Sequence, residues 1–241
     1  MIELHNLSCS FKNKQLLTNI TQSIPKHISI LGANGSGKST LAKAICNLVK
    51  YDGEITIMGE EITTLSLKDR AKMLSYIPAK LEIHDPYISV YEFVLQGRFP
   101  YKQSYSNYSY KDNEITKQTL EFLKISHLEN ISVSSLSSGE QQLVLIAQAL
   151  TQQSKIIIFD EPTANLDPHN SKLIAEHIKG LKEYHQIILI THDLHLACYI
   201  DSPVLFLKDK QLSYYEKEFF DDDVLQKLYG VNFHSMALQY D

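Results

Sequence analysis

The chain has 241 residues, enough for one large α/β domain or two small ones with a real core. Its formal charge of −5 and its pI near 6.1 argue against a general nucleic-acid binder. The three cysteines are scattered, which indicates neither a disulfide framework nor a zinc site and favours a reducing cytoplasm. No apolar run approaches the ~18 residues of a membrane span, so we expect any membrane role to come through a partner.

The first residues predict paired strands. Residues 2–7 and 8–11 alternate in the manner of a strand pair, and Phe11 precedes a polar turn at 12–14. Phe11 is either a core aromatic or, if a nucleotide binds further along the chain, a ring that stacks on its base.

A strand–loop–helix segment follows, and the rest of the chain is organised around it. Residues 27–31 predict a short buried strand and residues 38–48 a helix, and the loop between them fits the pattern G-x-x-x-x-G-K-[ST]. The glycines let successive N–H groups point into one concavity sized for phosphate oxygens, at the positive end of the helix dipole. Lys38 brings a positive charge to the β- and γ-phosphates, and the hydroxyl of Ser39 is placed to ligate Mg²⁺. The segment predicts a nucleoside triphosphate site formed by Gly32, Ala33, Asn34, Gly35, Ser36, Gly37, Lys38, Ser39 and Thr40.

Beyond the loop helix the pattern returns briefly to strands. Residues 51–59 predict a turn, a strand and a second turn, and residues 66–72 a polar helix. A short strand over 74–77 is stopped by Pro78.

Residues 79–150 change character and predict helices. Apolar spacing is helical over 89–97 and over 111–125, and no strand-like run lies between them. The segment 99–110 is rich in Tyr and Ser. It is either a solvated loop with partly buried rings or a surface that faces a partner, since Tyr is enriched at interfaces.

A well-capped helix is predicted after this segment. Ser137 or Ser138 is a good N-cap for a helix over 138–150, with acidic and amide residues in its first turn. On the residues alone, this segment indicates a helix start and nothing more.

Two adjacent carboxylates mark the end of the next strand. Residues 156–159 predict a fully buried strand, and Asp160 and Glu161 follow at its C-terminal end, where ligands bind in open α/β sheets. Asp160 can hold the Mg²⁺ shell while Glu161 polarises a water.

The last third of the chain continues the α/β alternation. A tight turn at 163–168 leads into a helix that ends near 182, and a buried strand over 186–191 ends at His192, where the γ-phosphate is expected. A hairpin turns at 209–210. Acidic residues then begin a helix over 224–229.

Together these residues resemble the ATP-binding subunits of ABC transporters, over essentially the whole chain. Residues 32–39 match the family's phosphate loop, and residues 137–141 look like its signature, with Ser138 in place of the usual middle glycine. Asp160 and Glu161 match the magnesium-organising aspartate and the catalytic glutamate. The resemblance also assigns a D-loop that ends at Asp167, a switch histidine at His192 and a base-stacking aromatic at Phe11.

Two further stretches narrow the resemblance, and one position departs from it. Residues 90–100 and 225–231 look like importers of iron–siderophores, haem or cobalamin, although zinc and manganese importers have similar subunits. Ala79 stands where the family normally carries a glutamine that reaches the Mg²⁺ and the attacking water.

The resemblance implies an α/β fold of the P-loop NTPase type, with a mostly parallel central sheet, N-terminal antiparallel strands and a helical insertion subdomain. We expect a single ABC ATPase domain over 1–241. Its core subdomain is expected at about 1–78 and 151–215, its helical subdomain at about 79–150 and its C-terminal helix at about 216–241.

The function implied is ATP hydrolysis with Mg²⁺ that drives import through a separate membrane permease. The resemblance implies a head-to-tail dimer in which Ser137, Gly139 and Asp167 of one copy contribute to the ATP site of the other. It places the subunit in the cytoplasm, peripheral on the inner face of the membrane, without direct insertion and without a nucleic-acid partner. Two alternatives remain: a soluble ABC ATPase in DNA repair, translation or cluster assembly, and a nucleotide switch without turnover, motivated by Ala79.

Overall fold

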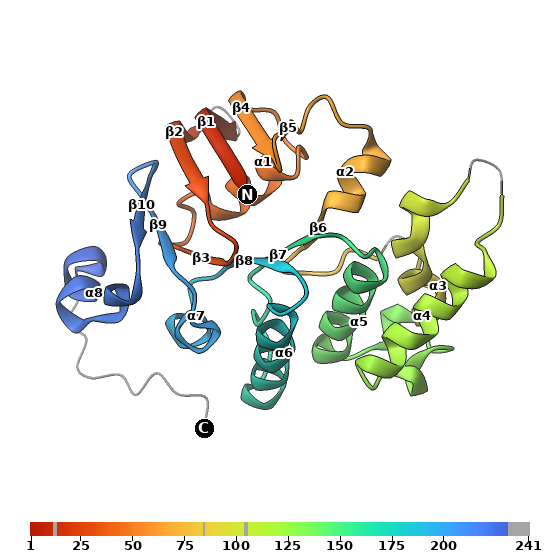
Figure 1. Ribbon diagram of the computed structural model, residues 1–241. Helices are drawn as coiled ribbons and strands as arrows, with labels where there is room; N and C mark the ends of the chain where they lie inside the picture. The colour runs from red at the N-terminus through yellow and green to blue at the C-terminus, as the bar shows by residue number, and fades with distance from the viewer. Residues whose placement is uncertain (12–13, 84, 104–105, 231–241) are drawn as a thin grey trace. The chain divides into compact units, whose positions relative to one another are not determined.

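The computed structural model describes residues 1–11, 14–83, 85–103 and 106–230 (Figure 1). Contacts divide the chain into two compact units. The first is formed by residues 1–64 with the residues from 175 onward, and the second by residues 65–174. The first unit therefore combines the two ends of the sequence, and the second is its middle.

The first unit contains an antiparallel sheet in the order β2-β1-β4-β5. Its strands are β1 (Ile2–Phe11), β2 (Lys14–Ile24), β4 (Asp52–Ile57) and β5 (Glu60–Glu61). The strand pair expected within residues 2–11 is wrong, because β1 is one strand that pairs with β2 from Ile2 to Phe11 with shifts in register. Asn6 takes a left-handed φ of 49°, which is typical of a bulge that bends a strand without reversing it.

Parallel strands form the other part of the first unit. Here β3 (Ile28–Leu31) lies between β8 (Gln186–Ile190) and β9 (Val204–Lys208), parallel to both. Every residue of β3 and β8 is buried, as expected for parallel strands covered on both faces. Helix α1 (Lys38–Ile45) contacts β1 and β8 and ends before the predicted 48, because Asn47 turns to a φ of 53°.

The segment from β9 to the last described residues also belongs to the first unit. The predicted hairpin is confirmed: β10 (Gln211–Tyr215) pairs antiparallel with β9, and both residues of its turn, Asp209 and Lys210, have positive φ. Phe206 of β9 packs with Phe219 and Tyr229, whose ring centroids lie 5.8 and 5.3 Å away. Helix α7 (Leu194–Ile200) lies between β8 and β9, and η4 (Lys217–Phe220) and α8 (Asp222–Tyr229) follow β10. The C-terminal helix expected at about 216–241 stays a prediction, because residues 231–241 lie outside the described residues.

The second unit consists of two parallel strands and a group of helices. Strands β6 (Leu74–Ile77) and β7 (Ile156–Asp160) pair in parallel. Helices α3, α4 and α5 pack on one another (Figure 1). The helices of this part are α2 (Leu67–Met73), α3 (Val90–Leu95), η1 (Gln96–Tyr101), α4 (Tyr110–Phe122), η2 (Ser126–Leu128), η3 (Val133–Ser135) and α5 (Ser138–Thr151), and α6 (Pro168–Leu181) begins here.

A buried cation anchors the Tyr-rich segment within the second unit. Arg98 is 3% exposed, and its Nε donates to Asp112 Oδ1 at 2.8 Å. The ring of Tyr101 lies 3.9 Å from the guanidinium carbon of Arg98, while Phe99 and Tyr110 remain exposed. The described part of residues 99–110 thus combines anchored and exposed rings, and residues 104–105 lie outside it.

These elements confirm the predicted α/β class, with parallel strands, an N-terminal antiparallel sheet and a helical middle segment. The expected division into core and helical subdomains stays a prediction. In the part of the chain that the structure describes, no helix has both the length and the apolar character that a membrane crossing needs.

Candidate nucleotide-binding site

The phosphate loop of the first unit packs tightly against the strand beside it. Gly32 follows β3 directly and has a φ of 153°. A Cβ at this position would lie 2.5 Å from the carbonyl oxygen of Leu207 in β9, so only glycine fits. Beyond it Ala33, Asn34 and Gly35 are exposed. The loop is therefore fixed on its inner side and open on its outer side.

The helix after the loop begins in a way that suits an anion. Gly37 is the N-cap of α1 and has no side chain to accept from the helix N–H groups, whereas α2 to α5 begin with a capping serine. The hydroxyl of Ser36 is buried without a hydrogen-bond partner among the described residues. Uncapped N–H groups and an unsatisfied hydroxyl both indicate that this loop is built to receive oxygen ligands.

Lys38 folds back over the loop it terminates. Its side chain is 6% exposed, and its Nζ donates to the carbonyl oxygens of Gly32 at 2.8 Å and Ala33 at 3.2 Å. The neighbouring Ser39 is exposed. The ammonium group is thus held against the loop carbonyls, next to the uncapped start of α1.

His192 lies at the same edge of the first unit as the phosphate loop. Strands β8 and β3 are parallel neighbours, with Ile190 opposite Ile30, and the backbone N–H of Thr191 donates to Ile30 O at 3.2 Å. Asp193 caps α7 by accepting from the N–H groups of residues 195 and 196. His192 is exposed in the short turn between these fixed elements, and its contact with a ligand stays a prediction.

The paired carboxylates lie in the second unit, at the carboxyl end of β7. Asp160 is 3% exposed and accepts a hydrogen bond from the hydroxyl of Tyr76, with Tyr76 Oη 2.7 Å from Asp160 Oδ2. Glu161 follows with a φ of 51°, in the left-handed region that residues other than glycine seldom occupy. Backbone strain of this kind is concentrated at functional sites.

The signature segment forms the capped helix start that the sequence predicts. Ser137 Oγ and Ser137 N both donate to Glu140 Oε2, at 2.6 and 2.8 Å, and the N–H of Glu140 donates to Ser137 Oγ. Hydrogen bonds from the side chain and backbone of Ser137 lower the pKa of Glu140. The first turn of α5 is therefore stabilised by residues of the signature itself.

The signature contacts the D-loop through Asn170. A Cβ on Gly139 would lie 2.6 Å from Asn170 Cγ. Asn170 Nδ2 in turn donates to Asp167 Oδ2 at 2.5 Å, and Asn170 N donates to Asp167 Oδ1 at 3.0 Å. The side chain of Asn170 thus lies against both Gly139 and Asp167, two residues that were predicted separately from the sequence.

Ala79 and Phe11 complete the predicted positions. Ala79 is exposed in the bend directly after β6, where Pro78 ends the strand. The backbone of Phe11 ends β1, but its side chain lies outside the described residues, so its proposed stacking on a base stays a prediction.

The residues fit Mg²⁺ and a nucleotide by their chemistry. The hydroxyl of Ser39 and the carboxylate of Asp160 are hard oxygen donors of the kind that Mg²⁺ prefers. The concavity bounded by Gly32 and the unsatisfied hydroxyl of Ser36 suit phosphate oxygens. Ser39 belongs to the first unit and Asp160 to the second.

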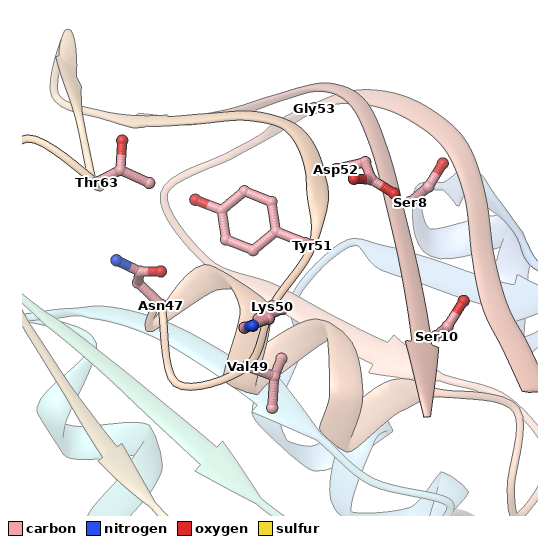
Figure 2. A pocket seen from close by; sticks show the side chains of 9 residues that line it. All are labelled: Ser8, Ser10, Asn47, Val49, Lys50, Tyr51, Asp52, Gly53 and Thr63. Carbon is pink, nitrogen blue, oxygen red and sulfur yellow. The ribbon is translucent and has the colours of Figure 1, made fainter. Parts of the chain in front are cut away.

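A polar pocket elsewhere in the first unit contains none of the predicted site residues. Figure 2 shows this pocket, about 500 Å³ in volume, with the ring of Tyr51 among its lining side chains. It is lined by Ser8, Ser10, Asn47, Val49, Lys50, Tyr51, Asp52, Gly53 and Thr63. Its opposite charges, Lys50 and Asp52, indicate no particular ligand.

Sequence reasoning missed two residues that contact the predicted set, Tyr76 and Asn170. Tyr76 reaches Asp160 only because β6 and β7 are neighbours, and the sequence does not give the order of strands in a sheet. The contact of Asn170 could have been predicted, because it lies three residues after Asp167. At that spacing the backbone N–H of a helix N3 residue donates to the side chain of the N-cap.

Comparisons with known proteins agree with this geometry. The family described as ABC transporter matches residues 17–164. A Helicobacter pylori protein named "Probable iron chelatin transport ATP-binding protein" is 34% identical and covers 88% of this chain and 85% of its own length. A Bacillus subtilis protein named "Probable siderophore transport system ATP-binding protein" is 32% identical, over 96% of this chain and 86% of its own.

A solved structure with a similar fold supports the same family. It is the dimeric structure of a post-hydrolysis state of an ATP-binding cassette bound to ADP and Pi, with a TM-score of 0.76 and 25% identity, over 90% of this chain and 98% of that one. The resemblance first drawn from the motifs is confirmed. The chain belongs to the ABC transporter family, as an ATP-binding chain with ATPase activity.

Proposed function

We propose that the chain hydrolyses ATP with Mg²⁺ and so powers an importer of iron–siderophore or a similar metal chelate. The observation that carries this proposal is the phosphate loop, where Lys38 is buried over the loop carbonyls at the start of an uncapped helix. The relatives named for iron chelatin and siderophore transport support the cargo class. Haem, cobalamin, zinc and manganese are the alternative cargoes.

Each site residue has a distinct task in this proposal. The N–H groups of the loop and the ammonium of Lys38 bind the β- and γ-phosphates, and Phe11 stacks on the base. Ser39 and Asp160 hold Mg²⁺, which neutralises charge on the phosphate oxygens when it is bound. Glu161 accepts a proton from the attacking water, and His192 contacts the γ-phosphate. Because Ala79 offers only a methyl group, water supplies one more of the metal ligands.

Two partners complete the proposed assembly. A second copy binds head to tail, so that Ser137, Gly139 and Asp167 of each copy close over the ATP of the other and exclude water. The dimeric solved structure supports this arrangement. A membrane permease carries the cargo, and the chain lies on the cytoplasmic face of the membrane through that permease.

Transport by cells tests the proposal directly. Cells that lack this chain should lose uptake of ⁵⁵Fe-labelled ferric siderophore and regain it with the wild-type chain, but not with Lys38→Ala or Glu161→Gln. Uptake of ⁶⁵Zn and ⁵⁴Mn serves as the control for cargo. Loss of metal-ion uptake with normal siderophore uptake would assign the alternative cargo. Normal uptake of every cargo would instead favour a soluble ABC ATPase.

The site itself is tested on the purified chain. Calorimetry should show Mg-ATP binding to the wild type and little to Lys38→Ala, because the variant loses the one cation in a cradle of neutral donors. Phosphate release separates an ATPase from a switch that binds without turnover. Equal affinity of wild type and variant would contradict the assignment of the phosphate loop.

A further inference from the structure

Tyr76 contacts the proposed metal ligand from the neighbouring strand. The ladder of β6 and β7 pairs Tyr76 with Ile158, two residues before Asp160 and therefore on the same face of its strand. The hydroxyl of Tyr76 donates to Asp160 Oδ2 at 2.7 Å, and the carboxylate is 3% exposed. A partly buried, charge-assisted bond of this length fixes the orientation of the acceptor.

The strand that carries Tyr76 is itself held in place. On the opposite face of β6, Ser75 Oγ lies 2.9 Å from Ser154 Oγ, and both hydroxyls are buried. At the start of the strand, Gln152 Nε2 donates to Leu74 O at 3.0 Å. The hydroxyl of Tyr76 thus starts from a fixed backbone, as a group that orients another side chain must.

The departure at Ala79 makes this orientation more important. Ala79 lies two residues after β6 and presents a methyl group, which cannot bind a cation. The proposed protein ligands are then Ser39 and Asp160 alone. With one ligand fewer, a larger share of metal affinity depends on the direction in which Asp160 presents its other oxygen.

We propose that Tyr76 is a positioning residue that orients Asp160 for Mg²⁺. This inference rests on the proposed function, in which Asp160 is a metal ligand. It assigns no proton transfer and no contact with the nucleotide to Tyr76. Its hydroxyl bonds to Oδ2 of Asp160, and through that bond it sets the direction in which the carboxylate faces.

The test compares two variants that each remove one hydroxyl from the second unit. Tyr76→Phe removes the bond to Asp160. Tyr91→Phe is the matched control, because Tyr91 Oη donates to Asn113 Oδ1 at 2.6 Å, a bond of similar length made by a side chain outside the predicted site. The readout is the affinity for Mn²⁺, measured by electron paramagnetic resonance with a non-hydrolysable ATP analogue bound. Affinity for the same analogue in excess EDTA is measured alongside.

We expect Tyr76→Phe to weaken Mn²⁺ binding on the order of 10-fold while metal-free nucleotide affinity stays unchanged. Tyr91→Phe should leave both affinities unchanged. Wild-type Mn²⁺ affinity in Tyr76→Phe, together with weakened binding in Asp160→Asn, would overturn the role of Tyr76 and leave the proposed function standing. Wild-type affinity in Asp160→Asn as well would overturn the metal site itself. An equal loss in Tyr91→Phe would show a general effect of losing a hydroxyl, and it too would overturn the inference.

Discussion

Glu161 shows how a single residue can be held in an unfavourable conformation by what precedes it. Its φ of 51° costs on the order of 1–3 kcal/mol for a residue with a side chain, yet it directly follows the fully buried strand β7. A strained carboxylate at a strand end is consistent with the proposed general base, although Asp209 and Lys210 also have positive φ in the hairpin turn.

The substitution Ala79→Gln tests what the missing side chain does. A glutamine amide offers a carbonyl oxygen to Mg²⁺, whereas the methyl group of Ala79 offers nothing, so water must supply that ligand at little cost in binding. Positioning of the attacking water should suffer more, and a misplaced water can cost on the order of 100-fold in rate. We therefore expect a slow wild-type ATPase whose kcat rises in Ala79→Gln, with the KM for ATP little changed.

Steady-state phosphate release at saturating Mg-ATP measures this effect, with Ala79→Ser as the control for a polar side chain too short to reach. A wild-type rate of ~1–10³ s⁻¹ that does not rise in Ala79→Gln would show that the chain compensates elsewhere. No hydrolysis even with the permease present would favour the non-hydrolysing switch.

At the scale of elements, Gly139 tests the contact between α5 and the start of α6. An added Cβ would lie 2.6 Å from the Asn170 side chain, which its bonds to Asp167 hold in place. We expect Gly139→Ala to lower the free energy of unfolding by about 1–3 kcal/mol through overpacking. In an Asn170→Ala background the same change should cost much less, because the obstructing side chain is gone.

Gly180 provides the matched control for this cycle. It lies inside α6, and a Cβ added there would meet no atom within 4 Å. Gly180→Ala should therefore be neutral or stabilising by at most about 0.5–1 kcal/mol, because Gly180 lies in the last turn of α6. Urea denaturation measures the free energy of unfolding of Gly139→Ala, Asn170→Ala, the double variant and Gly180→Ala. If Gly139→Ala lowers the free energy of unfolding equally with and without the Asn170 side chain, the contact between these two residues is not the cause of the destabilisation.

His27 links the start of β3 to β8 and makes stability depend on pH. Its Nδ1 accepts from the N–H of Ile187 at 3.3 Å, which requires an unprotonated nitrogen. Burial and the nearby charges of Lys182 and Lys26 lower its pKa to about 4. Because the unfolded state, with a pKa of about 6.5, binds the proton more readily, stability should fall as pH falls from about 6.5 through about 4.

His27→Gln isolates this effect, since its amide oxygen can accept the same bond and does not titrate. Denaturation midpoints across this pH range should fall less steeply in the variant than in the wild type. Parallel slopes for the two chains would mean that other groups, and not His27, govern the acid sensitivity.

The elements that the sequence could predict are those whose cause is local. The strand and helix on either side of residues 32–37, the serine N-cap predicted at 137 or 138, and the hairpin at Asp209–Lys210 each depend on neighbouring residues, and the structure contains these elements. The single bulged strand β1 differs from the strand pair predicted for residues 2–11, because alternation of side chains does not distinguish a bulge from the end of a strand. The bond from Tyr76 to Asp160 depends on which strands pair, a long-range choice that hydrophobic pattern does not encode.

At the scale of the whole molecule, the decisive prediction concerns the dimer. Glu161→Gln keeps the size and polarity of the side chain but cannot accept a proton from water, so ATP should bind without being hydrolysed. A stable dimer should then accumulate with saturating Mg-ATP, because product formation no longer opens it. Gel filtration with light scattering measures this, and Lys38→Ala in the same background is the control that should remain monomeric. A Glu161→Gln chain that stays monomeric with saturating ATP would contradict the head-to-tail site for the isolated chain.

Without a nucleotide, the carbonyl oxygens of Gly32 and Ala33 accept hydrogen bonds from Lys38, the residue proposed to bind phosphate. A buried ammonium without partners would be costly, but the bonds to Gly32 O and Ala33 O satisfy it inside the chain. Where an arriving phosphate replaces one of these bonds, the net gain in free energy is smaller than the contact that the phosphate makes. The ammonium group of Lys38 therefore keeps hydrogen-bond partners in the nucleotide-free protein, and release of product does not leave this charge unsatisfied. We therefore expect these two hydrogen bonds to lower the affinity for nucleotide and to speed its release.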